Sequence, residues 1–84
     1  MSYSLLILPR AQKQLAALPA EQLNVAELKI GALSDNPRPA GCKKLTERLG
    51  WRIRFGNYRI IYKIDDAAKT VTIMDVGHRR EIYR

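Results

Sequence analysis

Residues 51–64, WRIRFGNYRIIYKI, constrain the fold more than any other segment of the chain. Large apolar side chains alternate with basic ones on both sides of the dipeptide Gly56-Asn57. A period of two is typical of β-strands, and two residues that tolerate positive φ favour a tight hairpin loop. The segment therefore predicts two antiparallel strands, 51–55 and 58–64, joined by this dipeptide.

A two-residue loop also fixes the register of the two strands. The expected pairs are Phe55–Tyr58, Arg54–Arg59, Ile53–Ile60, Arg52–Ile61 and Trp51–Tyr62. Side chains alternate between the two faces of a strand, so one face is apolar and is expected to pack against helices. That face carries Trp51, Ile53, Phe55, Tyr58, Ile60 and Tyr62. The other face carries Arg52, Arg54, Arg59, Ile61 and Lys63.

The basic face has a cost, because Arg54 and Arg59 stand directly opposite each other. Cross-strand pairs change stability by roughly 0.2–1 kcal/mol, and like charges destabilise the sheet. Neither strand carries an acidic residue that would relieve the repulsion. One interpretation is a solvated basic face. The other is an anion site, because arginine stays charged and forms bidentate contacts with phosphate.

The segments before the hairpin predict one strand and two helices. Residues 3–8 form a short apolar run without a helical period, which indicates a strand. Pro9 suits a first helical turn, and Pro19 ends the helix whose apolar residues are Ala11, Leu15 and Leu18. A second helix is expected over 20–34, with a buried stripe of Leu23, Ala26, Ile30 and Leu33. The short connection between them predicts an antiparallel helical hairpin.

Local signals complete the topology. Residues 35–41, DNPRPAG, predict a loop, residues 42–45 a brief edge strand, and residues 70–77 a last strand. The order is then β-α-α-β-β-β, besides the brief edge strand. This order is typical of an α+β domain in which an antiparallel sheet is backed by helices on one face.

Composition and charge limit the functional classes. The 84 residues suffice for one domain, and no run approaches the ~20 apolar residues of a membrane span. The start does not resemble a signal peptide, and the single cysteine, Cys42, suits a reducing compartment, so we expect a cytoplasmic protein with a structural Cys42. The net charge is +7, and eleven of the 15 basic residues lie in 43–84. Such a field favours a polyanion, either nucleic acid or an acidic protein.

The tail, VGHRREIYR, adds further polar candidates. It holds His78, the one histidine of the chain and a residue type whose ordinary pKa lies near neutrality, and Tyr83, which can stack on a base or share its hydroxyl proton. A lone histidine at a strand end is more often a bystander than a catalyst. A metal site is not expected, because no second histidine, cysteine pair or carboxylate cluster accompanies His78.

The hairpin and the tail together resemble the RelE/ParE toxin superfamily, and its RelE branch in particular. The residues that carry the resemblance are WRIR, GNYRIIY and VGHRREIY, and the similarity covers residues 1–84 as a single domain. The resemblance implies a toxin of a toxin–antitoxin system. It implies a ribosome-dependent endoribonuclease that cleaves mRNA in the A site by attack of a 2′-hydroxyl on the adjacent phosphate, without a metal or other cofactor.

The resemblance also assigns roles to residues. It implies that the catalytic set includes Arg52, Arg54, Arg59, Arg79 and Tyr83. Additional RNA contacts are expected from Lys43, Lys44, Lys63 and Arg80. The implied partners are a cognate acidic antitoxin, the ribosome and mRNA, with DNA contacted only through the toxin–antitoxin complex and no membrane.

One departure from the family pattern changes the expected chemistry. The best-known RelE pattern has lysines where this chain has Arg52 and Arg54. Lysine can lose its proton in a crowded cationic site, whereas arginine cannot. We therefore assign proton transfer to Tyr83 or His78, and phosphate binding to the arginines.

Two other functions fit the same fold. One is a ParE-like inhibitor of DNA gyrase, which does not need a cluster of sheet arginines followed by Tyr83. The other is a catalytically inactive RelE-like binding module. Mapping of cuts on translated mRNA and scoring of gyrase-dependent DNA breaks separate the two toxins, and normal growth on strong expression favours the inactive module.

Overall fold

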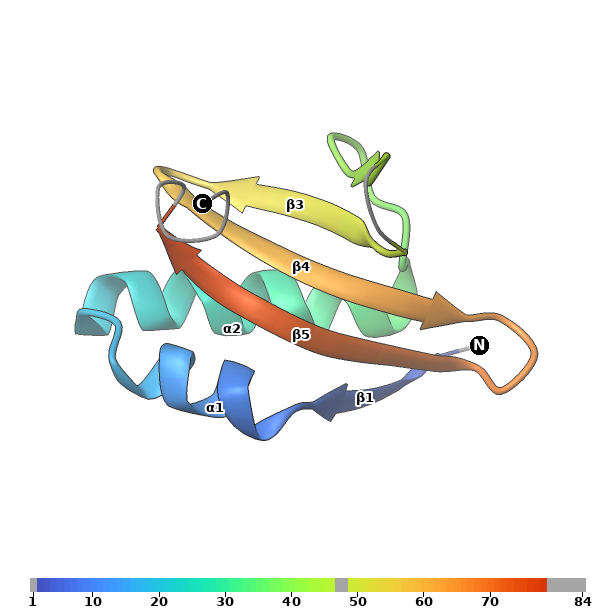
Figure 1. The fold of residues 1–84 in the computed structure, drawn as a ribbon, viewed down its shortest axis with the longest axis horizontal. Coiled ribbons are helices and arrows are strands. Elements are labelled where there is room, and N and C mark those ends of the chain that lie inside the picture. The colour runs from blue at the N-terminus through green and yellow to red at the C-terminus, as the bar shows by residue number, and fades with distance from the viewer. Residues whose placement is uncertain (1, 47–48, 79–84) are drawn as a thin grey trace.

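The computed structural model describes residues 2–46 and 49–78. It confirms the expected α+β architecture, in which two helices pack on a mostly antiparallel sheet (Figure 1). In chain order the elements are β1 (Ser4–Ile7), α1 (Pro9–Ala16), α2 (Ala20–Asp35), β2 (Lys43–Lys44), β3 (Trp51–Phe55), β4 (Tyr58–Asp65) and β5 (Thr70–His78). No helix in this part of the chain is long and apolar enough to cross a membrane.

The five strands lie in the order β1-β5-β4-β3-β2. Strands β2 to β5 pair antiparallel, whereas β1 pairs parallel with β5. The expectation of an antiparallel sheet is therefore wrong for this one pair. The helices between β1 and the other strands explain the difference, because a helical connection does not impose the reversal that a hairpin loop imposes.

The hairpin register is confirmed at all five predicted pairs, from Phe55–Tyr58 to Trp51–Tyr62. Of the two loop residues Gly56 alone has a positive φ, at +56°. Glycine at the first central position is the pattern of a type II′ turn, whose twist matches that of the flanking strands. The turn therefore holds Arg54 opposite Arg59.

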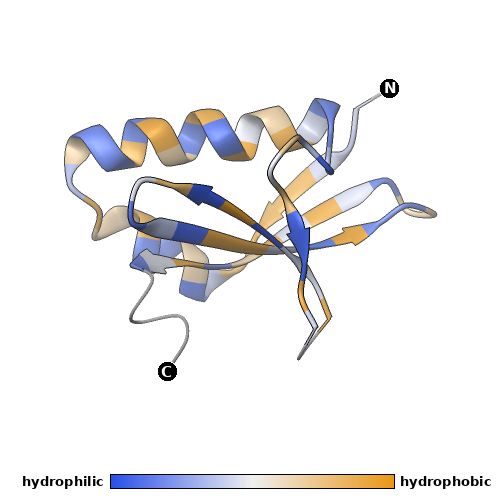
Figure 2. Ribbon diagram, turned by 90° about the horizontal axis from the view of Figure 1, so that it is seen from above, coloured by the Kyte–Doolittle hydropathy of each residue, from blue (hydrophilic) through white to orange (hydrophobic). Residues whose placement is uncertain are grey.

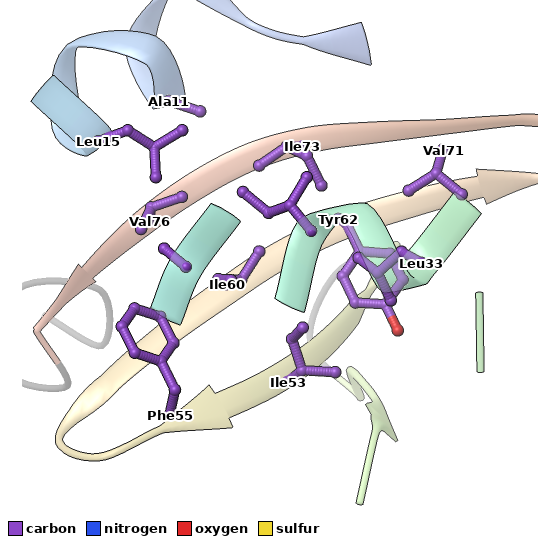
Figure 3. Close-up of a cluster of buried hydrophobic side chains, with 12 residues drawn as sticks. Ala11, Leu15, Leu33, Ile53, Phe55, Ile60, Tyr62, Val71, Ile73 and Val76 are labelled. Atoms are coloured by element: carbon purple, nitrogen blue, oxygen red, sulfur yellow. The ribbon is translucent and has the colours of Figure 1, made fainter. Parts of the chain in front are cut away.

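The core lies between the apolar face of the sheet and the helices. Helix α2 runs across this face, and its buried residues meet those of the strands (Figures 1 and 2). The helices supply Ala11, Leu15, Ala26, Ile30 and Leu33, and the strands supply Ile53, Phe55, Ile60, Tyr62, Val71, Ile73 and Val76 (Figure 3). The predicted helical stripes are thus buried, except that Leu18 and Leu23 are only partly covered.

The Tyr62 hydroxyl is the polar end of this core. It donates a 2.7 Å hydrogen bond to the carbonyl oxygen of Pro37, and burial raises the pKa of Tyr62, so the donor proton is retained. Cys42 packs partly buried against the same cluster. These contacts hold the loop after α2 against the sheet.

Where β1 ends, helix α1 lies along the edge of β5. The β1–β5 pairing stops at Ile73, and the side chain of Gln14 then accepts a 2.7 Å hydrogen bond from the backbone N–H of Val76. Gln14 also donates to Asp75 at 3.2 Å, and Arg10 forms a 2.9 Å ion pair with the same carboxylate. A helix side chain therefore takes the place of a strand partner, beside a bulge in the β4–β5 register between Ile61 and Tyr62.

Candidate functional site

The hairpin brings three arginines together on the face of the sheet that points away from α2. We call Arg52, Arg54 and Arg59 the arginine cluster. Arg54 and Arg59 are cross-strand partners, and Arg52 lies two residues from Arg54 on the same face. In a two-residue hairpin the flanking pair, Phe55–Tyr58, is hydrogen-bonded, so the next pair is the closer, non-hydrogen-bonded type. The two arginine side chains thus start about 4.5–5.5 Å apart at Cβ.

The three arginines differ in exposure. Arg54 is exposed, Arg52 is half-buried, and Arg59 is only 5% exposed. A fully solvated basic face is therefore not what the structure shows. Arg59 lies on β4, which is flanked by β3 and β5, and its partner on β5 is Gly77, which has no side chain to push it outward. Arg59 thus has a fixed position, whereas Arg54 is open to a ligand.

The three lysines expected to bind RNA lie at different positions relative to the arginine cluster. Lys43 pairs with Arg52 and therefore lies beside the arginine cluster, while Lys44 pairs with Trp51. Lys63 lies further along β4, opposite Thr72, and is exposed. Of the lysines expected to bind RNA, Lys43 is thus the one that adjoins the arginines directly.

His78 lies on the other face of the sheet. It pairs with Tyr58, and the two rings meet edge to face with centroids 5.7 Å apart. Tyr58 stacks at 5.3 Å on Phe55, which belongs to the core. Because Arg59 and Gly77 are the neighbouring pair, pleating directs the arginine and the histidine to opposite faces. The predicted site residues Arg79, Arg80 and Tyr83 lie outside the described residues.

A second polar cluster, which the sequence reasoning missed, lies at the other end of the sheet. Arg38 binds both carboxylate oxygens of Asp66, at 3.2 and 2.9 Å, and Tyr3 donates to the same carboxylate at 2.7 Å. The guanidinium of Arg38 also lies 5.1 Å from the ring centroid of Trp51. The cluster therefore ties the loop after α2 to the residue before β1, to the start of β3 and to the β4–β5 turn. Sequence separation hid it, since Arg38 and Asp66 are 28 positions apart.

The Arg38–Asp66 pair predicts a dependence of stability on pH. Hydrogen bonds from Arg38 and Tyr3 lower the pKa of Asp66 to about 2. A lowered folded-state pKa stabilises the fold above the unfolded value of about 3.9, and this contribution is lost as pH falls towards 2. We expect wild-type protein to melt at a higher temperature than Asp66→Asn at pH 5, and the difference to vanish near pH 2. The measurement is thermal unfolding followed by circular dichroism across this range.

The Arg38→Gln variant provides the control for this measurement. Without the guanidinium only the weaker Tyr3 hydrogen bond remains, so Asp66→Asn should change the pH profile of the melting temperature less than it does in the wild-type background. A melting difference between wild type and Asp66→Asn that stays constant from pH 5 to pH 2 would contradict the ion-pair explanation.

The chain is similar to known proteins over nearly its whole length. The family model described as the ParE toxin of type II toxin–antitoxin systems, parDE, matches residues 5–83. Toxin RelG of Mycobacterium tuberculosis is 38% identical over 86 residues, which cover 100% of this chain and 99% of that toxin.

The solved structures that share the fold include two toxin–antitoxin complexes. One is the RelBE2 toxin–antitoxin complex of M. tuberculosis, with 35% identity, a TM-score of 0.79, and coverage of 94% of this chain and 100% of the matched chain. The other is the archaeal RelE–RelB complex of Pyrococcus horikoshii, with 26% identity and a TM-score of 0.84, covering 94% and 97% of the two chains.

Proposed function

The chain belongs to the ParE toxin family of type II toxin–antitoxin systems and is a RelE-like toxin, and we propose that it is a ribosome-dependent endoribonuclease that cleaves mRNA in the A site. The observation that supports this proposal best is the arginine cluster, in which an exposed Arg54 stands opposite a buried Arg59. Because the hairpin places two like charges opposite each other, an anion bound between them would be attracted to both.

The proposed reaction uses this charge at the phosphorus. The 2′-hydroxyl oxygen forms a new bond to phosphorus while the bond to the 5′-oxygen breaks, leaving a 2′,3′-cyclic phosphate and a free 5′-hydroxyl. A base takes the 2′-hydroxyl proton, and an acid gives a proton to the leaving oxygen. The arginines would stabilise the negative charge that builds up on the phosphate oxygens, in a site that needs no reorganisation.

The cluster itself supplies no proton carrier, since arginine stays protonated at neutral pH. Of the two candidates proposed for proton transfer, His78 points to the helix side of the sheet with Tyr58. We therefore propose Tyr83 for this role.

The different roles of the two candidates can be tested by substitution. We expect His78→Gln to cleave within about threefold of the wild-type rate, far less than the ~10²–10⁴-fold contribution of a general acid or base. Tyr83→Phe should lose more activity than His78→Gln. The measurement is single-turnover cleavage of mRNA on programmed ribosomes. If His78→Gln instead lost more activity than Tyr83→Phe, proton transfer would be assigned to His78. If both variants cleaved at near wild-type rates, it would be assigned to ribosomal RNA.

The partners proposed for this toxin follow from its relatives and its charge. The RelBE2 and RelE–RelB structures are toxin–antitoxin complexes. We propose a cognate antitoxin with an acidic segment that covers the arginine cluster, in addition to the ribosome and mRNA. A partner that binds without reducing RNA cleavage would contradict this occlusion.

Inhibition of gyrase is the second candidate, because the matching family model is described by the parDE system. The two functions give different products. Cleavage on programmed ribosomes should yield fragments with 2′,3′-cyclic phosphate ends, whereas a gyrase poison should leave mRNA intact and produce gyrase-dependent DNA breaks. If the purified chain does neither and its strong expression permits normal growth, it is an inactive binding module.

A further inference from the structure

A solvent-open groove of about 440 Å³ lies at the outer edge of β3, beside α2. Its volume falls within the roughly 300–1,000 Å³ of typical ligand pockets. The lining residues come from α2, the following loop, β2 and β3: Lys29, Pro39, Ala40, Gly41, Lys43, Ile53 and Arg54. Three of these seven are basic and none of them is acidic. The groove therefore concentrates positive charge drawn from three separate elements.

The backbone of β3 also contributes to the groove. The β2–β3 pairing ends at the pair Lys43–Arg52, so β2 does not extend along Arg54. Peptide groups alternate in direction along a strand, and those of Phe55 point to its hydrogen-bonded partner Tyr58. The N–H of Arg54 therefore points to the outer side of β3, where the groove lies.

Gly41 lines the groove without a side chain. Its φ is +89°, a conformation that favours glycine, and no atom lies within 4 Å of the position that a Cβ would take. A ligand can thus approach the main chain closely at Gly41. Backbone N–H groups and lysine ammonium groups are the donors that bind phosphate.

The lining favours a phosphodiester over an amphipathic peptide. Such a peptide needs an apolar pocket for its anchor side chains. The largest apolar residue here, Ile53, is only 4% exposed, and the other apolar lining residues, Pro39 and Ala40, have small side chains. Arg54 contributes to both the arginine cluster and the groove, since its side chain lies in the cluster and its peptide N–H faces the groove. An RNA strand that leaves the cluster would therefore meet the groove next.

We propose that this groove binds a second backbone phosphate of the RNA strand, next to the phosphate at the arginine cluster, with Lys29 and Lys43 as its charged ligands. The inference rests on the proposed RNA substrate. It adds Lys29, on a helix outside the sheet, to the residues that determine how the RNA strand is placed.

The test measures binding of a labelled uridine octanucleotide to the purified toxin at a series of salt concentrations. Each lysine–phosphate contact on a single strand contributes about 0.7 to the slope of log affinity against log salt. We expect Lys29→Ala to reduce this slope by about 0.7. Lys13→Ala, which removes another exposed helical lysine that does not line the groove, should leave it unchanged.

A second measurement locates the site by NMR. Inorganic phosphate and the octanucleotide should shift the backbone amide signals of Gly41 and Arg54 in the wild type, and less in Lys29→Ala. An unchanged salt slope in Lys29→Ala overturns the proposal. So do shifts of these signals caused by an oligoglutamate peptide but not by the octanucleotide, since the groove would then be a carboxylate site for an acidic protein.

These outcomes are separable from the failure of the proposed function. If the toxin binds the octanucleotide through Lys29 but does not cleave mRNA on ribosomes, the groove proposal stands and the nuclease proposal fails. If the toxin cleaves mRNA but Lys29→Ala leaves the salt dependence of octanucleotide binding unchanged, the nuclease proposal stands and the groove proposal fails.

Discussion

Replacing Arg54 by alanine is expected to slow mRNA cleavage on programmed ribosomes by about 10²–10³-fold, the usual effect of removing one fixed donor that stabilises transition-state charge. The side chain is exposed, so its loss should leave the fold intact. Arg54 lies opposite the buried Arg59, and the pair forms the centre of the proposed phosphate site. The measurement is the single-turnover rate, with thermal unfolding as the check on folding.

Two variants control this result. Arg54→Lys keeps the charge but loses the bidentate geometry, so its rate should fall between those of alanine and wild type. Lys13→Ala removes a cation from α1 and should cleave at the wild-type rate. If Arg54→Ala cleaves within about threefold of the wild-type rate, far from the 10²–10³ expected, the cluster does not act on the reacting phosphate.

The largest effect on stability is expected from Leu33→Ala. Leu33 is fully buried between α2 and the sheet (Figure 3). Truncating such a leucine costs about 2–5 kcal/mol, through lost burial and the cavity that remains. A domain of this size has about 5–15 kcal/mol of stability and loses roughly 4–8 °C in melting temperature per kcal/mol. The measurement is equilibrium unfolding in urea.

Leu28→Ala is the matched control, because it makes the same chemical change on the same helix. Leu28 is 75% exposed, so its loss should change the free energy of unfolding by less than about 0.5 kcal/mol. Equal losses for the two variants would mean that α2 does not present Leu33 to the core.

The sequence was most informative where neighbouring residues determine the geometry. The Gly56-Asn57 loop sets the pairing of ten residues around it, and all five pairs were predictable without a structure. Helical spacing likewise identified Ala26, Ile30 and Leu33 as core residues. Both cases depend on local backbone periodicity, which the order of apolar and polar residues encodes directly.

Features that join distant segments could not be read in this way. Alternation placed Arg59 on the basic face, but its burial depends on the strands on either side of β4. The tail sequence suggested that His78 and the arginines act together, and only the β4–β5 register separates their faces. The groove depends on Lys29, Gly41 and Arg54, which meet through packing of α2 and its loop on β3.

The parallel pairing of β1 with β5 has a consequence for synthesis of the toxin. Each pair joins residues 66 positions apart, as Ser4 with Thr70, and β5 also separates β1 from β4. A nascent chain therefore cannot complete its sheet until residues 70–78 have left the ribosome that makes it. Such non-local pairing also slows folding. We therefore expect toxicity to begin only after β5 has been made and has paired with β1.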